Sequence, residues 1–275
     1  LHDGVTNLFC AFLNCSSLKE ITVPRSVENL SSAFSGCTAL ESAKLPDNLT
    51  AINGYAFYDC RSLASIDIPS TLYNLEGSAF RNCSSLTSVR IPAGIGSISD
   101  HTFSGCSGLT EITVPEGIHS IDTGAFSDCT SLTSVWLPST LDYMGRAVFM
   151  GCDGIERIWL PKDEPFYTSD NIFERKVYDE ATLYVPETAN MEYYNMIEPW
   201  SYFVNVEGFD FSGVEEVSGG YDPSVKCDVY DLQGHRVAGG LKGLPGGIYI
   251  VRQQGKAFIR RVAAGTGRSC GGDGL

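Results

Sequence analysis

The sequence lacks the signatures by which most enzymes are identified. It contains no GxSxG, HExxH, Walker or dinucleotide-binding string, and no EF-hand loop. Its four histidines are scattered along the chain, and the tight CxxC or HxxxH spacings of metal sites are missing. We therefore expect no catalytic residues, no cofactor and no bound metal.

Long apolar runs and positive charge are also scarce. No run approaches the roughly 20 apolar residues that a membrane helix needs. No basic-then-apolar leader is present, so we expect any signal peptide to have been cut off or left out of this sequence. Residues 1–211 carry a net charge of −16, whereas residues 212–275 carry +2. An acidic body argues against nucleic acid or an anionic membrane as the main partner. The change in charge predicts a domain boundary near residue 211.

Repetition is what the sequence has in abundance. Aligned on its cysteines, one unit reads AFxxCxxLxxIxIPxxLxxIxxx. The cysteines recur at spacings of 22, 23, 23, 23, 23 and 23 residues, and they are Cys15, Cys37, Cys60, Cys83, Cys106, Cys129 and Cys152. A fixed period in this range is typical of a solenoid, in which each coil buries its apolar residues against its neighbours.

Each part of the unit predicts a local structure. The alternating letters of LxxIxI predict a short strand, which the following proline ends. AFxxC fits one tight helical or 3₁₀ turn, and PxxLxxI supplies a second row of inward side chains. We therefore predict a mainly β fold, a right-handed solenoid with one strand of a parallel sheet in each coil of about 23 residues.

The periodic cysteines, Cys15 through Cys152, are predicted to be buried free thiols. Equivalent residues on neighbouring coils lie about 4.8 Å apart with parallel side chains. A disulfide instead needs converging side chains with Cβ atoms about 3.8 Å apart. Partial bridging remains the alternative.

The repeat resembles the BspA-like leucine-rich repeats, a cell-surface family common in Bacteroides-type bacteria. The phenylalanine, cysteine, Leu/Ile triplet and proline of that family recur here in about seven units, from residue 1 to roughly residue 211. The first unit is clipped, so we expect Leu1 to mark a cut through a longer array or the site of a lost cap. The resemblance implies a leucine-rich-repeat protein on the outer cell surface, or secreted, that adheres to a host or bacterial surface protein.

A capping segment is predicted over residues 187–211, where the period breaks after the last coil, TLYVP. Thr188 or Asn190 is expected to cap a short helix that Pro199 ends. LYVP followed by a Tyr-rich helix and WxxF resembles the closing segment of the same family. The residues expected to cover the open end of the core are Trp200, Phe203 and Val206.

A second domain is predicted over residues 212–263. SGVEEVSGGYDPS is a linker candidate, alternating apolar letters predict short strands, and Gln254-Gly255 is a hairpin-turn candidate. The strings YDLQGHRV and GIYIV resemble the C-terminal sorting domain of type IX-secreted proteins, which implies a small β-sandwich-like domain for export or attachment. Residues 264–275 are expected to form a flexible tail, and a domain that has lost its sorting role is the alternative.

Candidate binding residues come from the polar letter inside LxxIxI, which points out of the sheet. Down the stack this letter reads Thr22, Lys44, Asp67, Arg90, Thr113, Trp136, Trp159 and Tyr184. Exposed aromatic clusters mark binding surfaces, so the candidate partner-binding residues are Trp136, Trp159 and Tyr184, with Arg157 and Glu156 beside them to orient a ligand. The alternative is that residues 162–180 or the C-terminal domain fold over this stripe.

These observations together predict a non-enzymatic, extracellular module for protein binding or adhesion. The alternative is a structural spacer or envelope-anchoring element without its own ligand. A third possibility, an enzyme acting on surface glycans, would need two carboxylates in one cleft. His101 and His119 are expected to be solvated loop residues.

Overall fold

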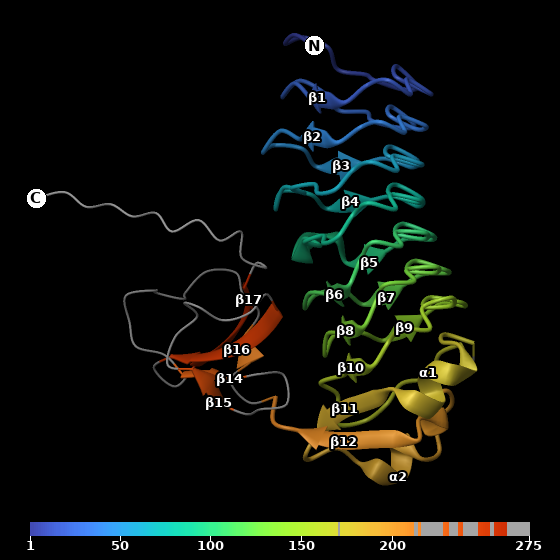
Figure 1. The fold of residues 1–275 in the computed structure, drawn as a ribbon, viewed down its shortest axis with the longest axis vertical. Helices are drawn as coiled ribbons and strands as arrows, with labels where there is room; N and C mark the ends of the chain where they lie inside the picture. The colour runs from blue at the N-terminus through green and yellow to red at the C-terminus, as the bar shows by residue number, and fades with distance from the viewer. Residues whose placement is uncertain are drawn as a thin grey trace, which may run out of the picture. The chain divides into compact units, whose positions relative to one another are not determined.

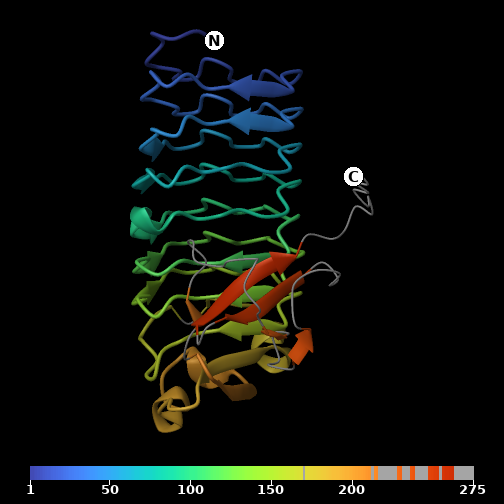
Figure 2. The same cartoon turned by 90° about the vertical axis from the view of Figure 1, so that its left-hand side faces the viewer.

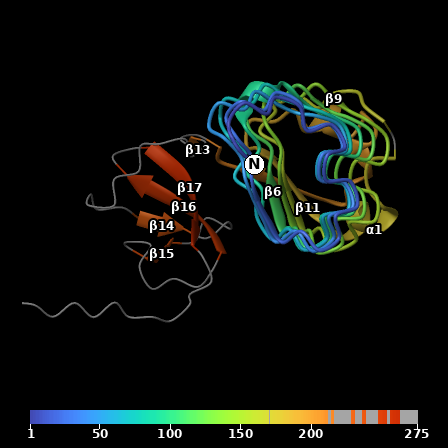
Figure 3. The ribbon, with the colours of Figure 1, turned by 90° about the horizontal axis from the view of Figure 1, so that it is seen from above.

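The computed structural model divides the chain into two compact units, Leu1–Phe209 and Asp210–Leu275 (Figure 1). It describes residues 1–169 and 171–211 in full, and in the second unit only the backbone of five strands. The first unit is a stack of coils that superimpose when viewed along the stack (Figure 3). Coils of about 23 residues are therefore the building unit, as the period predicts.

The LxxIxI segments form a row of strands along one side of this stack (Figure 2), except at residues 63–68 and 86–91, which form no strand. All their pairings are parallel, in a two-stranded sheet β1-β2 and a five-stranded sheet β12-β11-β10-β8-β6. We call the outward surface of this row the strand-row face. Its strands are β1 (Glu20–Thr22), β2 (Ser42–Lys44), β6 (Glu111–Thr113), β8 (Ser134–Trp136), β10 (Arg157–Trp159), β11 (Thr182–Pro186) and β12 (Asn205–Phe209).

The PxxLxxI segments form a second row of parallel strands, where the sequence predicted only inward side chains. One sheet pairs β3 (Ala51–Ile52) with β4 (Asn74–Leu75), and another has the order β5-β7-β9. The strands of the latter are β5 (Ser97–Ile98), β7 (Ser120–Ile121) and β9 (Tyr143–Met144). One strand per coil was therefore too few, because the coil that contains β6 and β7 contributes a strand to each row.

The AFxxC segment is a single turn and not a helix. The cysteine N–H donates to the phenylalanine carbonyl three residues before it, as from Cys106 to Phe103 at 3.1 Å. The phenylalanine N–H instead donates to the next coil, as from Phe103 to Ala125 at 2.8 Å. A left-handed residue precedes each cysteine and stops the turn from continuing as a helix. These residues are Asn14, Gly36, Asp59, Asn82, Gly105, Asp128 and Gly151.

Side chains from one coil fill the space beside the left-handed glycine of the next. A Cβ atom on Gly105 would collide with the Asn82 side-chain oxygen, and Asn14 blocks Gly36 in the same way. Asp59 differs because the next left-handed residue is Asn82, which has a side chain of its own. The Asp59 carboxylate accepts two hydrogen bonds of 3.0 Å from Arg61. An Asn or Asp here therefore either covers a glycine or is held by a cation.

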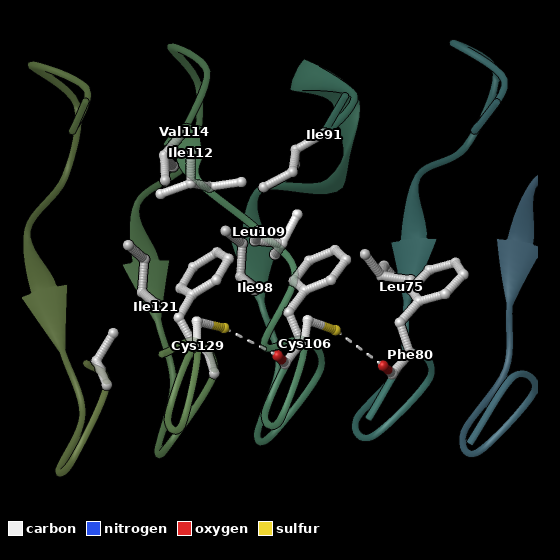
Figure 4. Packing of buried hydrophobic residues seen from close by; sticks show 14 of the residues in the cluster. Leu75, Phe80, Ile91, Ile98, Cys106, Leu109, Ile112, Val114, Ile121 and Cys129 are labelled. Carbon is white, nitrogen blue, oxygen red and sulfur yellow. Dashed lines mark hydrogen bonds between the residues drawn. The ribbon is translucent and has the colours of Figure 1, made fainter. Parts of the chain in front are cut away.

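Columns of phenylalanine and cysteine fill the interior (Figure 4). From Phe12 to Phe149, and on to Phe173 in the last coil, neighbouring rings stack with centroids 5.2–5.5 Å apart. Each buried thiol lies 3.1–3.3 Å from a phenylalanine carbonyl of the preceding coil. The fully buried thiols are Cys37, Cys60, Cys83, Cys106, Cys129 and Cys152.

The prediction of a free-thiol ladder is confirmed from Cys37 through Cys152, since these six and the other cysteines of residues 1–169 are free. It is wrong for Cys15, which is exposed because it belongs to the first coil and has a neighbouring coil on one side only. Burial raises the pKa of the Cys37 thiol to about 11 and that of Cys106 to about 12. The Cys37 and Cys106 thiols are therefore neutral at physiological pH.

The end of the solenoid contains two short helices, α1 (Arg175–Glu180) and α2 (Met191–Tyr194). The sequence did not predict α1. Asn190 occupies the N-cap position of α2, but its side chain makes no capping hydrogen bond, and the helix ends before Pro199 is reached. Thr188, the other candidate cap, donates to Asp163 at 2.6 Å instead.

The apolar residues of the capping segment close the core much as predicted. Trp200, in the 3₁₀ turn η2 (Trp200–Tyr202), is buried, and its Nε1 donates to the Phe166 carbonyl at 2.8 Å. Phe203 is also buried, whereas Val206 is half-buried against the core. Val206 lies in β12, which extends the sheet by one parallel strand that the sequence did not predict.

The five strands of the second unit form one sheet of order β13-β17-β16-β14-β15. Only the β13–β17 pair is parallel. The strands are β13 (Val214–Glu215), β14 (Asp228–Tyr230), β15 (Arg236–Ala238), β16 (Gly247–Gln253) and β17 (Lys256–Val262). The predicted turn at Gln254-Gly255 and the tail over residues 264–275 lie outside the described residues, and the sandwich and its sorting role stay predictions.

Candidate binding surface

Three aromatic side chains lie in one row on the strand-row face, and we call them the aromatic stack: Trp136, Trp159 and Tyr184. They occupy equivalent positions of β8, β10 and β11, because the parallel register pairs each with the next. The two indole centroids are 4.5 Å apart with planes 8° from parallel, and the Tyr184 ring follows at 5.3 Å and 13°. The predicted alignment on adjacent coils is therefore confirmed.

The aromatic stack is covered, so the interpretation as an open platform is wrong for both tryptophans. Trp159 has no exposed surface and Trp136 has 5%, while Tyr184 is half-buried. Part of the cover is Phe209, at the end of β12, whose ring meets Trp136 edge-on at 6.2 Å and Tyr184 at 6.0 Å. Burial raises the pKa of Tyr184, and the nearby Glu207 carboxylate adds to that rise.

Two buried nitrogen donors accompany the rings. Trp159 Nε1 and Arg157 Nε are buried and have no hydrogen-bond partner. They belong to alternate residues of β10, so both side chains leave the same face of the strand. The outer end of the Arg157 side chain reaches Glu156, with 3.6 Å between Nη2 and Oε2, and Glu156 is largely exposed. The predicted orienting residues thus lie beside the stack, as the sequence placed them.

The N-terminal half of the strand-row face has a different character. Its outward residues, Thr22, Lys44, Asp67 and Arg90, are exposed. An open groove of about 720 Å³ lies over β1, β2 and the following coil, and Glu20, Lys44 and Asp67 are among its lining residues. Charged, small polar and aliphatic residues line this groove, and none of them is aromatic.

His101 and His119 do not belong to the aromatic stack. His119 is exposed, as predicted, and its Nδ1 lies 3.2 Å from Asp142 Oδ2. This hydrogen bond, with help from Lys162, lowers the pKa of the Asp142 carboxyl. His101 was expected to be solvated but is half-buried, with its ring over Gly124 of the next coil.

Within residues 1–169 and 171–211 and the described strands, no three His, Cys, Asp or Glu side chains gather closely enough to hold a metal ion. None of the helices within the same ranges is long and apolar enough to cross a membrane.

Phe209 is the residue of this surface that the sequence analysis missed. It lies outside the repeat, so no periodic position predicted it. The local signal was available in NVEGF, where Asn205, Glu207 and Phe209 alternate with Val206 and would leave a strand on its outer face. Because β12 follows the cap, its place beside β11 depends on the path of the cap and not on the period.

A comparison with known families decides the relationship of the chain. The profile described as "BspA type Leucine rich repeat region (6 copies)" matches residues 9–133 and 75–189, which is more than half of the chain. The chain belongs to this BspA-type leucine-rich-repeat family. No curated protein is similar enough to this BspA-type chain to count as a relative.

Solved structures of bacterial leucine-rich-repeat proteins are similar to this BspA-type chain. The T. pallidum leucine-rich-repeat protein is 33% identical with a TM-score of 0.50, over 56% of this chain and 74% of that one. A leucine-rich-repeat protein from Bacteroides ovatus is 22% identical, with a TM-score of 0.48, over 74% and 64%. A leucine-rich cell-surface protein from Faecalibacterium prausnitzii is 24% identical, with a TM-score of 0.43, over 72% and 62%. The chain thus spans less than two thirds of the latter two.

Proposed function

We propose that this BspA-type chain is a non-enzymatic, extracellular protein-binding module for adhesion to a host or bacterial surface protein. The partner docks on the strand-row face around the aromatic stack, with Arg157 and Glu156 orienting it. One observation carries the proposal. Three stacked aromatic rings lie outside the core cluster, at a position that other coils fill with polar residues, beside two buried donors without partners.

The charge of the chain supports a protein partner over nucleic acid. Residues 1–211 carry −16, which repels polyanions and favours a neutral or basic surface. Aromatic contact should nevertheless supply more of the affinity than long-range attraction. We therefore expect binding to survive moderate salt, at which attraction between exposed charges is largely screened.

A spacer or envelope-anchoring element is the second candidate, and the burial of Trp136 and Trp159 favours it. In a spacer, the aromatic stack would only tie the last coils to β12. A partner must instead displace part of the cover or bind at its rim, where Tyr184 and Arg157 are accessible. The two candidates therefore differ in how binding responds to changes at the rim.

The experiment measures capture of host and bacterial surface proteins by the full chain and by two rim variants, Tyr184→Ala and Arg157→Ala. Matched controls are two exposed tyrosines away from the stack, Tyr143→Ala in β9 of the second strand row and Tyr167→Ala. A binding module loses capture of a saturable partner by about tenfold or more in the rim variants, as truncated anchors do. Equal capture by rim and control variants with unchanged melting temperatures would leave only the spacer.

A further inference from the structure

Phe209 contacts the aromatic stack as a bound side chain would. Its ring stands at 83° to the Trp136 ring and at 69° to the Tyr184 ring, and these two rings flank Trp159. Edge-to-face geometry of this kind is a preferred arrangement of aromatic pairs. The stack is therefore shaped to receive one aromatic side chain from outside the sheet.

The contact with Phe209 leaves two buried polar atoms beside the aromatic stack without hydrogen bonds. Trp159 Nε1 and Arg157 Nε are buried donors without partners, and the Phe209 ring offers no acceptor. A buried donor without a partner is unfavourable and rare enough in native proteins to need an explanation. A ligand with one aromatic ring and a neighbouring oxygen acceptor would satisfy both the rings and the nitrogens.

The local charges favour a neutral acceptor over a carboxylate. Glu156 lies 3.6 Å from the Arg157 guanidinium and already balances its charge. The Glu207 carboxylate acts on Tyr184 at the other end of the stack, where it raises the pKa of the hydroxyl. A further carboxylate would be repelled by both, whereas a backbone carbonyl would not. An extended peptide offers carbonyls next to each side chain.

Phe209 lies at the end of its strand. It is the last residue of β12 and of the first unit, and its ladder partner is Pro186. Release of Phe209 from the stack would therefore leave the pairs from Asn205 to Gly208 in place.

We propose that the aromatic stack is the receptor site for an aromatic side chain on an extended, uncharged peptide segment of the partner, and that Phe209 occupies this site until the partner displaces it. The peptide carbonyls accept hydrogen bonds from Trp159 Nε1 and Arg157 Nε. This inference rests on the proposed function, because it specifies what the partner presents to the same surface. It makes Phe209 an intramolecular competitor, since a tethered group acts at an effective concentration on the order of millimolar.

The test uses the full chain and the blocked peptide Ac-Gly-Ser-Phe-Ser-Gly-NH2, with binding followed by calorimetry. Phe209→Ala should bind this peptide at least about tenfold more tightly than the unmodified chain, because the competitor is gone. Replacing the peptide phenylalanine with alanine should abolish binding, and replacing a serine with aspartate should weaken it. In the Phe209→Ala background, Arg157→Ala should weaken binding, whereas Tyr167→Ala should not.

A Phe209→Ala chain that melts like the unmodified chain and gains no affinity would overturn the inference. If Phe209→Ala does not fold, Phe209→Leu keeps apolar contact without the edge-on ring, and absence of a gain there has the same meaning. Surface-protein capture separates this failure from that of the proposed function. If capture of surface proteins depends on Tyr184 but Phe209→Ala gains no affinity for the peptide, only the role of Phe209 as a competitor is rejected. If Phe209→Ala gains affinity for the peptide but capture does not depend on Tyr184, the docking site of the proposed function is rejected.

Discussion

The two halves of the strand-row face share one scaffold but differ in what they display. Around β1 and β2 the outward residues are exposed and polar or charged, such as Thr22, Lys44 and Asp67. Around β8 and β10 the same positions hold Trp136 and Trp159, which are buried under a cover that includes Phe209. The parallel register is equivalent in both halves.

This difference shows which positions of the repeat are constrained by folding. Positions whose side chains point into the core are constrained, because each must pack against the equivalent residue of the next coil. The phenylalanine column accordingly runs unbroken beneath both halves. Outward letters do not contribute to the core, so they can vary from coil to coil. Three aromatic residues in succession at an outward position are therefore not required by the repeat itself.

The largest effect is expected from truncation, because the aromatic half depends on the cap. A chain of residues 1–211 should melt cooperatively, whereas a chain of residues 1–186 should not, since it loses β12, Trp200 and Phe203 from the end of the core. Circular dichroism melting and size-exclusion chromatography measure this. A soluble, cooperative chain of residues 1–186 would show that the cap is dispensable.

The next largest effect should separate the two halves directly. Trp159→Ala removes a side chain with no exposed surface and should lower the free energy of unfolding by about 3 kcal/mol, as large-to-small changes at buried sites do. Asp67→Ala, at the equivalent outward position of the polar half, should change it by less than about 0.5 kcal/mol. Denaturant unfolding compares them, and similar values would mean that the cover over Trp159 contributes no stability.

Much of this architecture could be predicted from the sequence because it is periodic. The cysteine spacing correctly placed the buried thiols from Cys37 onward, the alignment of Trp136 with Trp159 and most of the LxxIxI strands, although residues 63–68 and 86–91 form none. Within the repeat the sequence did not predict the second row of strands. The other failures lie where the period stops or a neighbour is missing. Cys15 has one neighbouring coil, and α1, β12 and Phe209 follow the last regular repeat. Covering of the aromatic stack depends on that aperiodic path, so no repeat rule could decide it.

A moderate effect should be equal in both halves, because it concerns the shared interior. Cys60→Ser and Cys129→Ser should each lower the free energy of unfolding by about 1–3 kcal/mol, since a hydroxyl is more polar than a thiol and is buried in the same place. The control Cys15→Ser, at an exposed thiol, should change it by less than about 0.5 kcal/mol. Markedly unequal values for the two buried sites would show that the core is not uniform.

Thiol reactivity gives an independent measurement of the same interior. Alkylation followed by peptide mass mapping should label Cys15 in the native chain and the six buried cysteines only after unfolding. Labelling of Cys106 or Cys129 at the rate of Cys15 would contradict the buried ladder.

The smallest effect should appear at alkaline pH. The folded-state pKa values of Cys37 and Cys106, about 11 and about 12, lie above the value near 9 expected in the unfolded chain. Between those limits the unfolded chain has lost protons that the folded chain keeps, so the free energy of unfolding falls as the pH rises above about 9. Urea unfolding between pH 7 and pH 10.5 measures the slope. Cys106→Ala should show a shallower slope, and an unchanged slope would contradict this assignment.

The contact between Asn82 and Gly105 limits how such an array can grow. A coil with asparagine before its cysteine can be followed by a coil with glycine there, or its side chain must be held elsewhere, as Arg61 holds Asp59. Single coils are therefore not interchangeable, even though their cores are. A genetic duplication that copies a block whose last and first coils fit each other preserves the junction. The heritable unit of this protein is thus a compatible set of coils and not one repeat.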